Sequence, residues 1–263
     1  MTRHARLLAF LSAVVLTPLL AAQAAAPEET FTLDATVALD AYSAAAESRI
    51  EGVLAATRTL AATEEARSGD WARMRELLAV LAAHATEHAA VWYARPDGSY
   101  FTVEKGLTGE TLRERTYFPG LMAGREVVGA LVISKSTGKR SLIVASPVLL
   151  AGKVVGAVGV SLDAAKFAAS LDQAIRFPPE VVFYALDDQG QTALHRAGDL
   201  IFVFPSDVGS PTLGDAVKTM LSRPEGVVRY AYSGSDRTAA FRRSTLTGWV
   251  YVLGKAHPPA VTP

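Results

Sequence analysis

Residues 115–118 read Arg-Thr-Tyr-Phe, and three apolar segments follow them, which contain Val-Ile-Ser-Lys-Ser-Thr-Gly (132–138), Ala-Ser-Pro-Val (145–148) and Gly-Val-Ser-Leu (159–162). These segments predict strands at residues 127–133, 141–148 and 154–162, joined by turns at 136–139 and 151–153. An arginine and two aromatic residues that precede an antiparallel sheet are typical of a small binding pocket. The stretch therefore predicts binding rather than catalysis.

The segments on either side of this stretch follow one repeated plan. Upstream, strands are predicted at 91–94 and 100–103, joined by the turn Pro96-Asp97-Gly98. After Pro178-Pro179 the same order returns, with strands at 181–186, 191–195, 227–232, 237–243 and 249–253. Each half therefore has a hairpin, an insertion and a three-strand meander. This organisation predicts an α+β fold with two five-stranded antiparallel sheets and flanking helices.

Helical periodicity is strongest before the first sheet. Residues 34–62 contain no proline and place apolar residues three and four positions apart, which predicts one long helix along both sheets. A second helix is predicted to start with Asp70 as its N-cap, and its apolar stripe runs through Trp71 and Met74 to His88. Two shorter helices are expected at 163–174, capped by Asp163, and near 213–222.

Composition limits the classes of function that remain. The 263 residues carry a formal net charge of zero and include no cysteine. Disulfides, thiolate catalysis and a cysteine lipid anchor are thereby excluded. Nucleic-acid binding is not expected either, because such proteins usually present a basic face.

The first 26 residues have the pattern of a signal peptide. Arg3, His4 and Arg6 precede an apolar run over 7–20, and Ala22-Gln23-Ala24 fits a small-residue cleavage rule. Removal of this segment leaves 24 basic and 26 acidic residues. The alternative is an uncleaved membrane anchor. No later segment approaches the roughly 20 apolar residues that a membrane span requires, so we expect an exported, periplasmic protein.

The predicted domain organisation has five parts. A signal peptide (1–26) is followed by N-terminal helices (27–89), a first sheet module (90–177), a second sheet module (178–256) and a tail (257–263).

The order of these motifs resembles the double Cache sensor domains, the PAS-like extracellular ligand-binding regions of bacterial chemoreceptors and sensor kinases. In that family a long N-terminal helix backs two modules, and the first contains an Arg-x-Tyr-Phe element, a Ser-Thr-Gly hairpin and a Ser-Pro-Val strand. The corresponding residues here are 115–118, 136–138 and 146–148. The second module typically has an Asp-x-x-Gly turn and a closing Thr-Gly-Trp, here 187–190 and 247–249.

The resemblance implies that the first module, which is the membrane-distal type, binds the ligand. Arg115 is expected to hold a carboxylate with parallel charge-assisted hydrogen bonds. Tyr117 and Phe118 are expected to form the pocket walls, and the predicted set also includes Tyr100, Ser134 and Ser161. Surface exposure of the arginine and ordinary core packing of the two aromatics remain alternatives.

One departure from the family pattern concerns the ligand. Amino-acid-binding members place a tyrosine and an aspartate in the third strand and an aspartate near the end of the fifth. The register assigned here puts Val132, Ser134 and Ser161 at those positions, and Asp163 lies two residues further on. Since a serine carries no negative charge to balance a ligand ammonium group, the expected ligand is a small anion such as an organic acid.

A second departure concerns signal output. The sequence ends shortly after Leu253, at Pro263, without a recognisable transmitter. We therefore expect a stand-alone binding protein that signals through a separate membrane receptor, kinase or transporter. The long helix also allows a homodimer, although its pattern is no strict heptad. A scaffold with no small ligand is the alternative from a different class.

The remaining alternative is an enzyme. His84, Glu87 and His88 match the H-x-x-E-H pattern of inverted zinc proteases, in which two histidines on one helical face bind zinc. A five-residue pattern of this kind arises readily by chance in an alanine-rich helix. No Gly-x-Ser-x-Gly elbow is present, and His195 is interpreted as structural. We therefore expect a non-enzyme without a cofactor.

Overall fold

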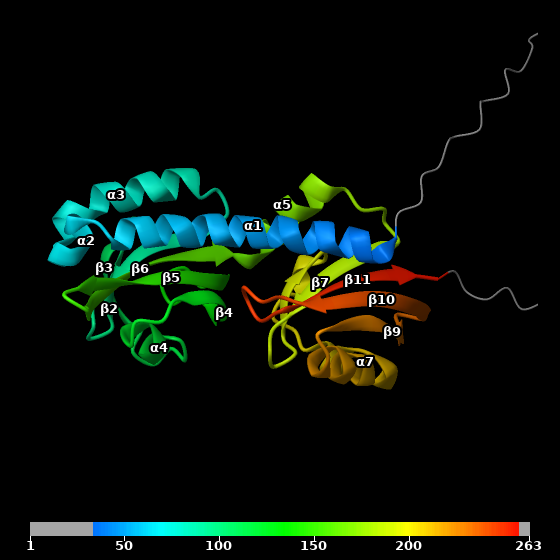
Figure 1. Cartoon of the computed structure of the whole chain (residues 1–263). Helices are drawn as coiled ribbons and strands as arrows, with labels where there is room; N and C mark the ends of the chain where they lie inside the picture. The colour runs from blue at the N-terminus through cyan, green and yellow to red at the C-terminus, as the bar shows by residue number, and fades with distance from the viewer. Residues whose placement is uncertain (1–33, 258–263) are drawn as a thin grey trace, which may run out of the picture. The chain divides into compact units, whose positions relative to one another are not determined.

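The computed structural model describes residues 34–257, and Figure 1 shows how the elements are arranged. The predicted signal peptide and residues 258–263 of the predicted tail lie outside the described residues. No helix within 34–257 is long and apolar enough to cross a membrane.

Three helices open the described part of the chain: α1 (Ala35–Ala61), α2 (Glu64–Ser68) and α3 (Trp71–His84). The Asp34 carboxylate accepts a hydrogen bond from the Thr36 N–H at 2.7 Å, which caps α1. The buried residues of α1 recur every three or four positions, from Leu39 and Tyr42 to Thr57 and Ala61. Asp70 caps α3 through the Ala72 N–H at 2.9 Å. Both predicted helix starts are therefore confirmed.

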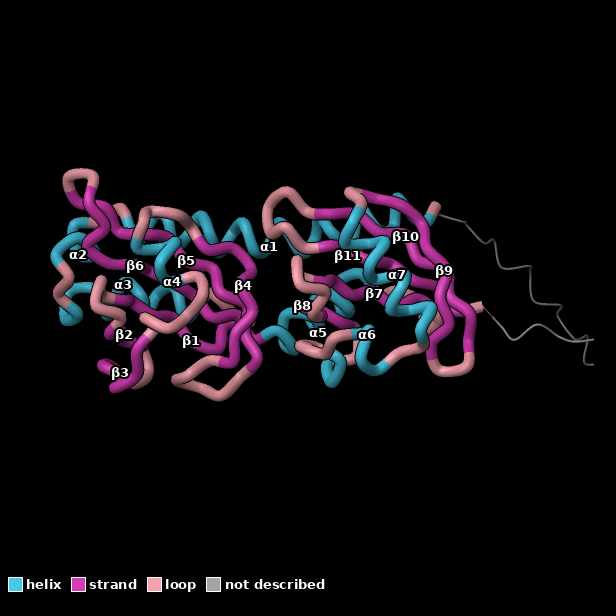
Figure 2. The backbone as a smooth tube through the Cα atoms, turned by 90° about the horizontal axis from the view of Figure 1, so that it is seen from below, coloured by secondary structure: helices cyan, strands magenta, loops and turns pink. Residues whose placement is uncertain are grey.

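The first sheet is antiparallel and has the order β3-β2-β1-β6-β5-β4 (Figure 2). Its strands are β1 (His88–Ala94), β2 (Ser99–Thr102), β3 (Gly106–Thr111), β4 (Val127–Ile133), β5 (Arg140–Leu150) and β6 (Lys153–Asp163). The prediction of five strands is wrong for this sheet, because β3 adds an edge strand. The side chains of β3 are exposed or half-buried, so the apolar alternation that reveals a strand is absent from its sequence.

The second sheet has five antiparallel strands, as predicted, and their order is β8-β7-β11-β10-β9. They are β7 (Val181–Leu186), β8 (Thr192–His195), β9 (Glu225–Tyr232), β10 (Ser235–Arg243) and β11 (Val250–Ala256). Ser233 and Gly234 form a two-residue hairpin loop between β9 and β10, and both have positive φ, at 50° and 76°. This is the turn geometry that matches strand twist.

The helices cover both faces of the sheets. In Figure 1, α1 runs along one face of both sheets, and its contacts include β5 and β6 of the first and β10 and β11 of the second. The opposite faces carry α4 (Phe118–Met122) on the first sheet and α7 (Pro211–Ser222) on the second. The chain passes between the sheets through α5 (Ala164–Ile175), capped by Asp163 as predicted. A short turn, η1 (Gly198–Leu200), and α6 (Pro205–Val208) lie between β8 and α7.

The helical face required for the zinc alternative does not form. Helix α3 ends at His84, and His88 is the first residue of β1. Sheet pairing overrides the helical pattern here, because His88 pairs with Leu162 and the Glu87 carbonyl accepts the Asp163 N–H at 2.8 Å. The Glu87 carboxylate accepts a hydrogen bond from Ser170 at 3.0 Å. No cluster of three potential metal ligands forms among residues 34–257.

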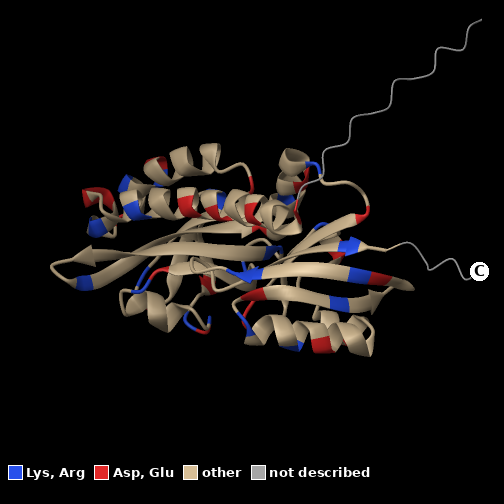
Figure 3. Cartoon of the chain, turned by 45° about the vertical axis from the view of Figure 1, so that its right-hand side comes forward, with Lys and Arg blue, Asp and Glu red and all other residues tan. Residues whose placement is uncertain are grey.

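Residues of opposite charge are mixed along the chain. Figure 3 shows acidic and basic positions interspersed along α1 and over the strands, in keeping with the net charge of zero.

Candidate functional site

Arg115 lies in the loop between β3 and α4. The Arg115 N–H donates to the Leu112 carbonyl and the Phe118 N–H donates to the Arg115 carbonyl, both at 2.9 Å, which fixes the loop as two turns. A terminal guanidinium nitrogen donates to the Ile133 carbonyl at 2.5 Å. The Nε atom is buried and has no hydrogen-bond partner among the residues that the structure describes. Arg115 therefore retains one unused donor away from water.

Three of the other predicted site residues lie together beside Arg115. Tyr100 and Phe118 are 3% and 4% exposed and pack in one cluster with the half-buried Tyr117. Burial raises the pKa of Tyr117 well above its ordinary value, while the charge of Arg115 opposes the rise and Tyr100 adds to it. Arg115 precedes Tyr117 by two residues in the same loop, and it precedes Phe118, the first residue of α4, by three. An arginine, two tyrosines and a phenylalanine thus gather on the face of the first sheet that is turned away from α1.

The two predicted serines make other contacts. Ser134 follows β4, and its Oγ accepts the Thr137 N–H at 3.3 Å and lies 3.2 Å from the Ser136 Oγ, within the hairpin turn. Ser161 on β6 is 5% exposed, and its Oγ accepts a hydrogen bond from the Trp92 Nε1 at 3.2 Å. Within residues 34–257, neither serine is hydrogen-bonded to Arg115.

Asp163 lies two residues after Ser161, the position at which amino-acid-binding members have an aspartate. The Asp163 carboxylate already has two partners. It accepts the Lys166 N–H at 3.2 Å as the cap of α5 and forms an ion pair with the Lys139 Nζ at 3.0 Å. Its side chain is 11% exposed. A ligand ammonium would therefore have to compete with a helix cap and a lysine for this carboxylate.

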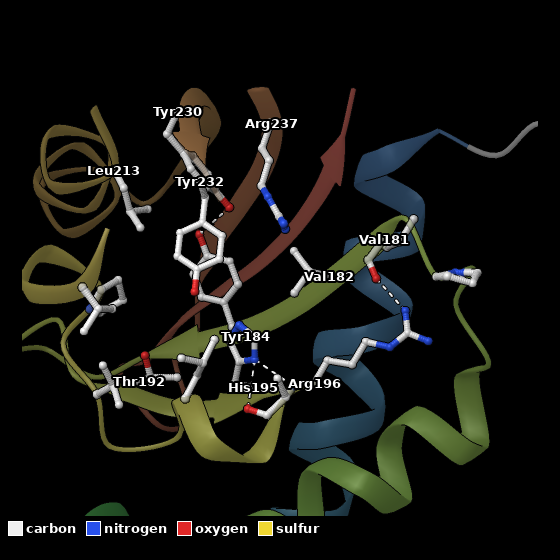
Figure 4. Close-up of a pocket in the computed structure, with 16 residues that line it drawn as sticks. Val181, Val182, Tyr184, Thr192, His195, Arg196, Leu213, Tyr230, Tyr232 and Arg237 are labelled. Carbon is white, nitrogen blue, oxygen red and sulfur yellow. Dashed lines mark hydrogen bonds between the residues drawn. The ribbon is translucent and has the colours of Figure 1, made fainter. Parts of the chain in front are cut away.

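A cavity of about 450 Å³ lies on the second sheet, on the same side as α7 (Figure 4). Figure 4 shows side chains from four strands converging on it: Tyr184 of β7, His195 of β8, Tyr232 of β9 and Arg237 of β10. Tyr184 is 5% exposed and stacks on the His195 ring, with centroids 5.8 Å apart. Burial lowers the pKa of His195 to about 4, so the ring is neutral near pH 7.

This cavity was not predicted, although the sequence contains a signal for it. Tyr230 and Tyr232 share one face of β9 because side chains alternate along a strand. Arg237 pairs with Tyr230 in the β9–β10 register, so its side chain lies on that same face. One strand contains Tyr-x-Tyr, the next contains an arginine, and a short turn joins them. This pattern could have predicted the cluster. The interpretation of His195 as structural did not consider these neighbours.

Comparison with known proteins places the chain in a family. Residues 25–260 match the Cache domain family. No curated protein matches the chain. Among solved structures, the chain is similar to the ligand-binding domain of the Pseudomonas aeruginosa PAO1 amino acid chemoreceptor PctB in complex with L-Arg. The TM-score is 0.65 with 16% identity, over 87% of this chain and 94% of that chain.

Two further structures share the fold. The sensor domain of the V. cholerae histidine kinase DctB aligns with a TM-score of 0.64 and 14% identity, over 85% of this chain and 96% of that chain. The ligand-binding domain of the Campylobacter jejuni chemoreceptor Tlp3, in complex with 4-methylisoleucine, aligns with a TM-score of 0.63 and 12% identity, over 87% and 93%. At such low identity these likenesses establish the fold alone.

The family match and the architecture agree. Two antiparallel sheets with a long helix along them were predicted and are present, although the first sheet has six strands instead of five. The chain belongs to the Cache domain family.

Proposed function

We propose that this chain is the ligand-binding part of a sensor and that it binds a small organic acid on the first sheet. The ligand carboxylate is held by Arg115, with Tyr117, Phe118 and Tyr100 around it. Ser134 and Ser161 border the site. The chain binds this ligand reversibly and does not convert it chemically.

The observation that carries this proposal is the unused donor of Arg115. A guanidinium Nε that is buried without a partner is costly, and a ligand carboxylate would relieve that cost with a charge-assisted hydrogen bond. Tyr117 lies two residues from Arg115 in the same loop, and the charge of Arg115 opposes the rise that burial causes in the pKa of Tyr117. Together they present a cation and a hydroxyl to one anionic group.

The nearby carboxylates already form hydrogen bonds or ion pairs, which favours a ligand acid without an ammonium group. Asp163 caps a helix and pairs with Lys139. Asp97 accepts hydrogen bonds from the Ser99 N–H and hydroxyl, at 2.9 and 2.7 Å. Glu114 pairs with Lys135 at 3.4 Å. A ligand amine would have to displace one of these partners, whereas a simple organic acid would not.

Cache domains are typically extracellular sensor domains. We propose export to the periplasm through the signal-like segment 1–26, and transfer of the signal to a separate membrane receptor, kinase or transporter. Mass measurement of protein recovered from a periplasmic extract tests removal of residues 1–26. Solution mass with and without ligand tests the predicted homodimer.

A thermal-shift screen tests the ligand class. Propionate, succinate and L-malate are compared with L-alanine, L-glutamine and γ-aminobutyrate. A ligand at 100 times its Kd stabilises the protein by about 2.7 kcal/mol, which corresponds to a rise in Tm of about 5 to 10 °C for a chain of this size. We expect that rise for an organic acid only.

Two variants locate the binding. Arg115→Gln should abolish the thermal shift, because it removes the charge that holds the carboxylate. Arg113→Gln is the matched control, since Arg113 is exposed in the same loop and its Nε donates to the Asp97 carbonyl at 3.2 Å. Stabilisation by amino acids alone would refute the organic-acid ligand. No shift with any compound would favour the ligand-free scaffold.

A further inference from the structure

The cavity on the second sheet contains a cation with no structural partner. The Nε of Arg237 is buried and has no hydrogen-bond partner, and the guanidinium forms no ion pair within residues 34–257. Its carbon Cζ lies 5.2 Å from the centroid of the Tyr232 ring, a cation–π contact that holds the group over the cavity wall. Arg237 lines the cavity together with Tyr184, Tyr230 and His195, so its charge faces the interior of this site (Figure 4).

The other arginine at this cavity is fully occupied. Arg196 donates to the carbonyls of Pro178, Val181 and Phe177 at 2.6 to 2.9 Å, and it pairs with Asp172 at 3.1 Å. These bonds tie β8 to the segment that precedes β7. Arg196 therefore stabilises the fold, and Arg237 is the cation that a bound molecule would meet.

A neutral donor lies beside Arg237. The Tyr184 hydroxyl donates to the Tyr230 oxygen at 3.3 Å, so Tyr230 accepts that bond and keeps its own proton for another acceptor. The described residues that line the cavity include no acid, and many are apolar, among them Val182, Val208 and Leu213. The polar groups thus favour an anion, and the walls favour an apolar body.

We infer that the second module has its own ligand site, which binds a small carboxylic acid with an aromatic or branched apolar body. Arg237 and Tyr230 hold the carboxylate, and the body lies against Tyr232 and the aliphatic wall. A volume of about 450 Å³ falls within the range of known small-molecule sites. Without an acidic side chain in the lining, an amine would lose its hydration with no ion pair in return.

Calorimetric titration of the full chain with three probes of one shape tests this inference. Phenylacetate carries the carboxylate, phenylacetamide is its neutral isostere, and phenethylamine carries a positive charge. We expect phenylacetate to bind at least about tenfold more tightly than either analogue, in line with the strength of a hydrogen-bonded charge. Equal affinity for phenylacetate and phenylacetamide, or no binding of phenylacetate at millimolar concentration, would overturn the inference.

Five variants separate this site from the one on the first sheet. Arg237→Gln should weaken phenylacetate binding at least about tenfold, and Arg237→Lys should restore part of it because the charge remains. Val208→Trp should also weaken binding, since Val208 lines the cavity but is 55% exposed, so a larger side chain can obstruct the cavity while the core stays unchanged. Arg229→Gln should leave phenylacetate binding unchanged, since Arg229 is exposed and does not line the cavity. Loss of binding in Arg115→Gln with full binding in Arg237→Gln would assign the probe to the first sheet and refute the second site. Circular dichroism of each variant confirms folding.

Discussion

The two sheets of this protein each present an arginine on the face turned away from α1, and the two arginines differ in what surrounds them. Arg115 lies in a loop and donates to the Ile133 carbonyl, within a packed aromatic cluster. Arg237 lies in a strand and rests over Tyr232 at the wall of a cavity of about 450 Å³. Both keep a buried Nε without a partner among the described residues. A guanidinium group therefore lies next to packed aromatic residues in the first module and at the wall of a cavity in the second.

The difference follows from the element that carries each arginine. A strand fixes the direction of its side chains through pairing, and Arg237 is held in register opposite Tyr230. The Arg115 loop is held by turn hydrogen bonds and by the packing of Phe118. Loops rearrange more readily than strands. We therefore expect the first site to change shape when its ligand binds and the second to accept its ligand with little change.

The largest effect that separates the two sheets should come from glycines beneath their aromatic residues. A Cβ at Gly159 in the first sheet would lie 2.5 Å from the Trp92 Cε2, whereas one at Gly254 in the second would lie 3.2 Å from the Tyr230 hydroxyl. Gly159→Ala should lower the free energy of unfolding by about 3 kcal/mol through overpacking, and Gly254→Ala by about 1 kcal/mol. Urea denaturation measures both.

Gly52→Ala is the control for these substitutions. Gly52 lies in α1, and no atom lies within 4 Å of the position that an added Cβ would occupy, so alanine should stabilise the protein by about 1 kcal/mol through helix propensity. Equal losses for Gly159→Ala and Gly254→Ala would show that the two faces tolerate added volume equally, and the expected contrast between the sheets would then be wrong.

Much of this fold could be predicted because its signals are local. Asp70 and Asp163 are helix caps that the sequence shows directly, and each caps its helix in the structure. The strands of the second sheet contain short apolar runs between turns. Strand β3 was missed because an edge strand with exposed side chains has no such run. Helix α3 was extended past His84 because the pairing of His88 with Leu162 depends on residues more than 70 positions apart.

The candidate sites divide in the same way. That Arg115, Tyr117 and Phe118 lie close together follows from their adjacency in sequence. The bond from Arg115 to Ile133, the contact of Ser161 with Trp92 and the second cavity all depend on how distant segments pack. Residue type and spacing indicate which side chains could bind a ligand. Only the three-dimensional structure shows which of their donors have no hydrogen-bond partner.

The next largest expected effect is a loss of stability at acid pH. Burial lowers the pKa of His195 from its ordinary value of 6.5 to about 4, the Ala197 and Asp199 neighbours oppose this, and Arg237 adds to it. Between these values the unfolded chain binds a proton that the native protein does not, so stability falls as the pH drops from 6.5 toward 4. We expect His195 to account for a loss of about 2 kcal/mol.

Thermal denaturation at pH 7 and pH 4.5 measures this loss. His195→Gln should show a smaller acid-induced fall in Tm than the wild type, and the exposed His84→Gln in the helical layer of the first module should behave as the wild type. The interpretation fails if His195→Gln loses as much stability in acid as the unsubstituted protein. That result would mean that the second sheet tolerates a charged imidazole in its cavity.

A smaller effect compares the two halves of α1. Against the first sheet, Thr57 donates to the Leu54 carbonyl at 2.9 Å, and its Oγ1 lies 2.9 Å from the Ser146 Oγ. Thr57→Val should cost about 1.5 kcal/mol, because it leaves the buried serine hydroxyl without its acceptor. Against the second sheet, the buried Tyr42 hydroxyl has no partner among the described residues. Tyr42→Phe should therefore be neutral or stabilise the protein by about 1 kcal/mol.

The exposed Thr59→Val is the control for Thr57, since Thr59 donates only to the Ala55 carbonyl within α1. Chemical denaturation of the three variants decides the comparison. A large loss on Tyr42→Phe would show that the tyrosine hydroxyl contributes to the second interface, and the two halves of α1 would then be alike.

The smallest effect should come from the ion pairs that link α1 to each sheet. Arg58 donates to both carboxylate oxygens of Glu126 at 2.6 Å, next to the first sheet, and Arg242 of the second sheet pairs with Asp40. The Arg58 hydrogen bonds lower the pKa of Glu126, so their contribution is present above its ordinary value of 4.5 and is lost as the pH falls below it. Because both pairs are solvent-exposed, Glu126→Gln and Asp40→Asn should each lower the Tm by less than about 2 °C, and 1 M NaCl should remove the difference. A larger, salt-resistant loss in one variant alone would show that charge, and not only apolar packing, determines which sheet α1 holds more firmly.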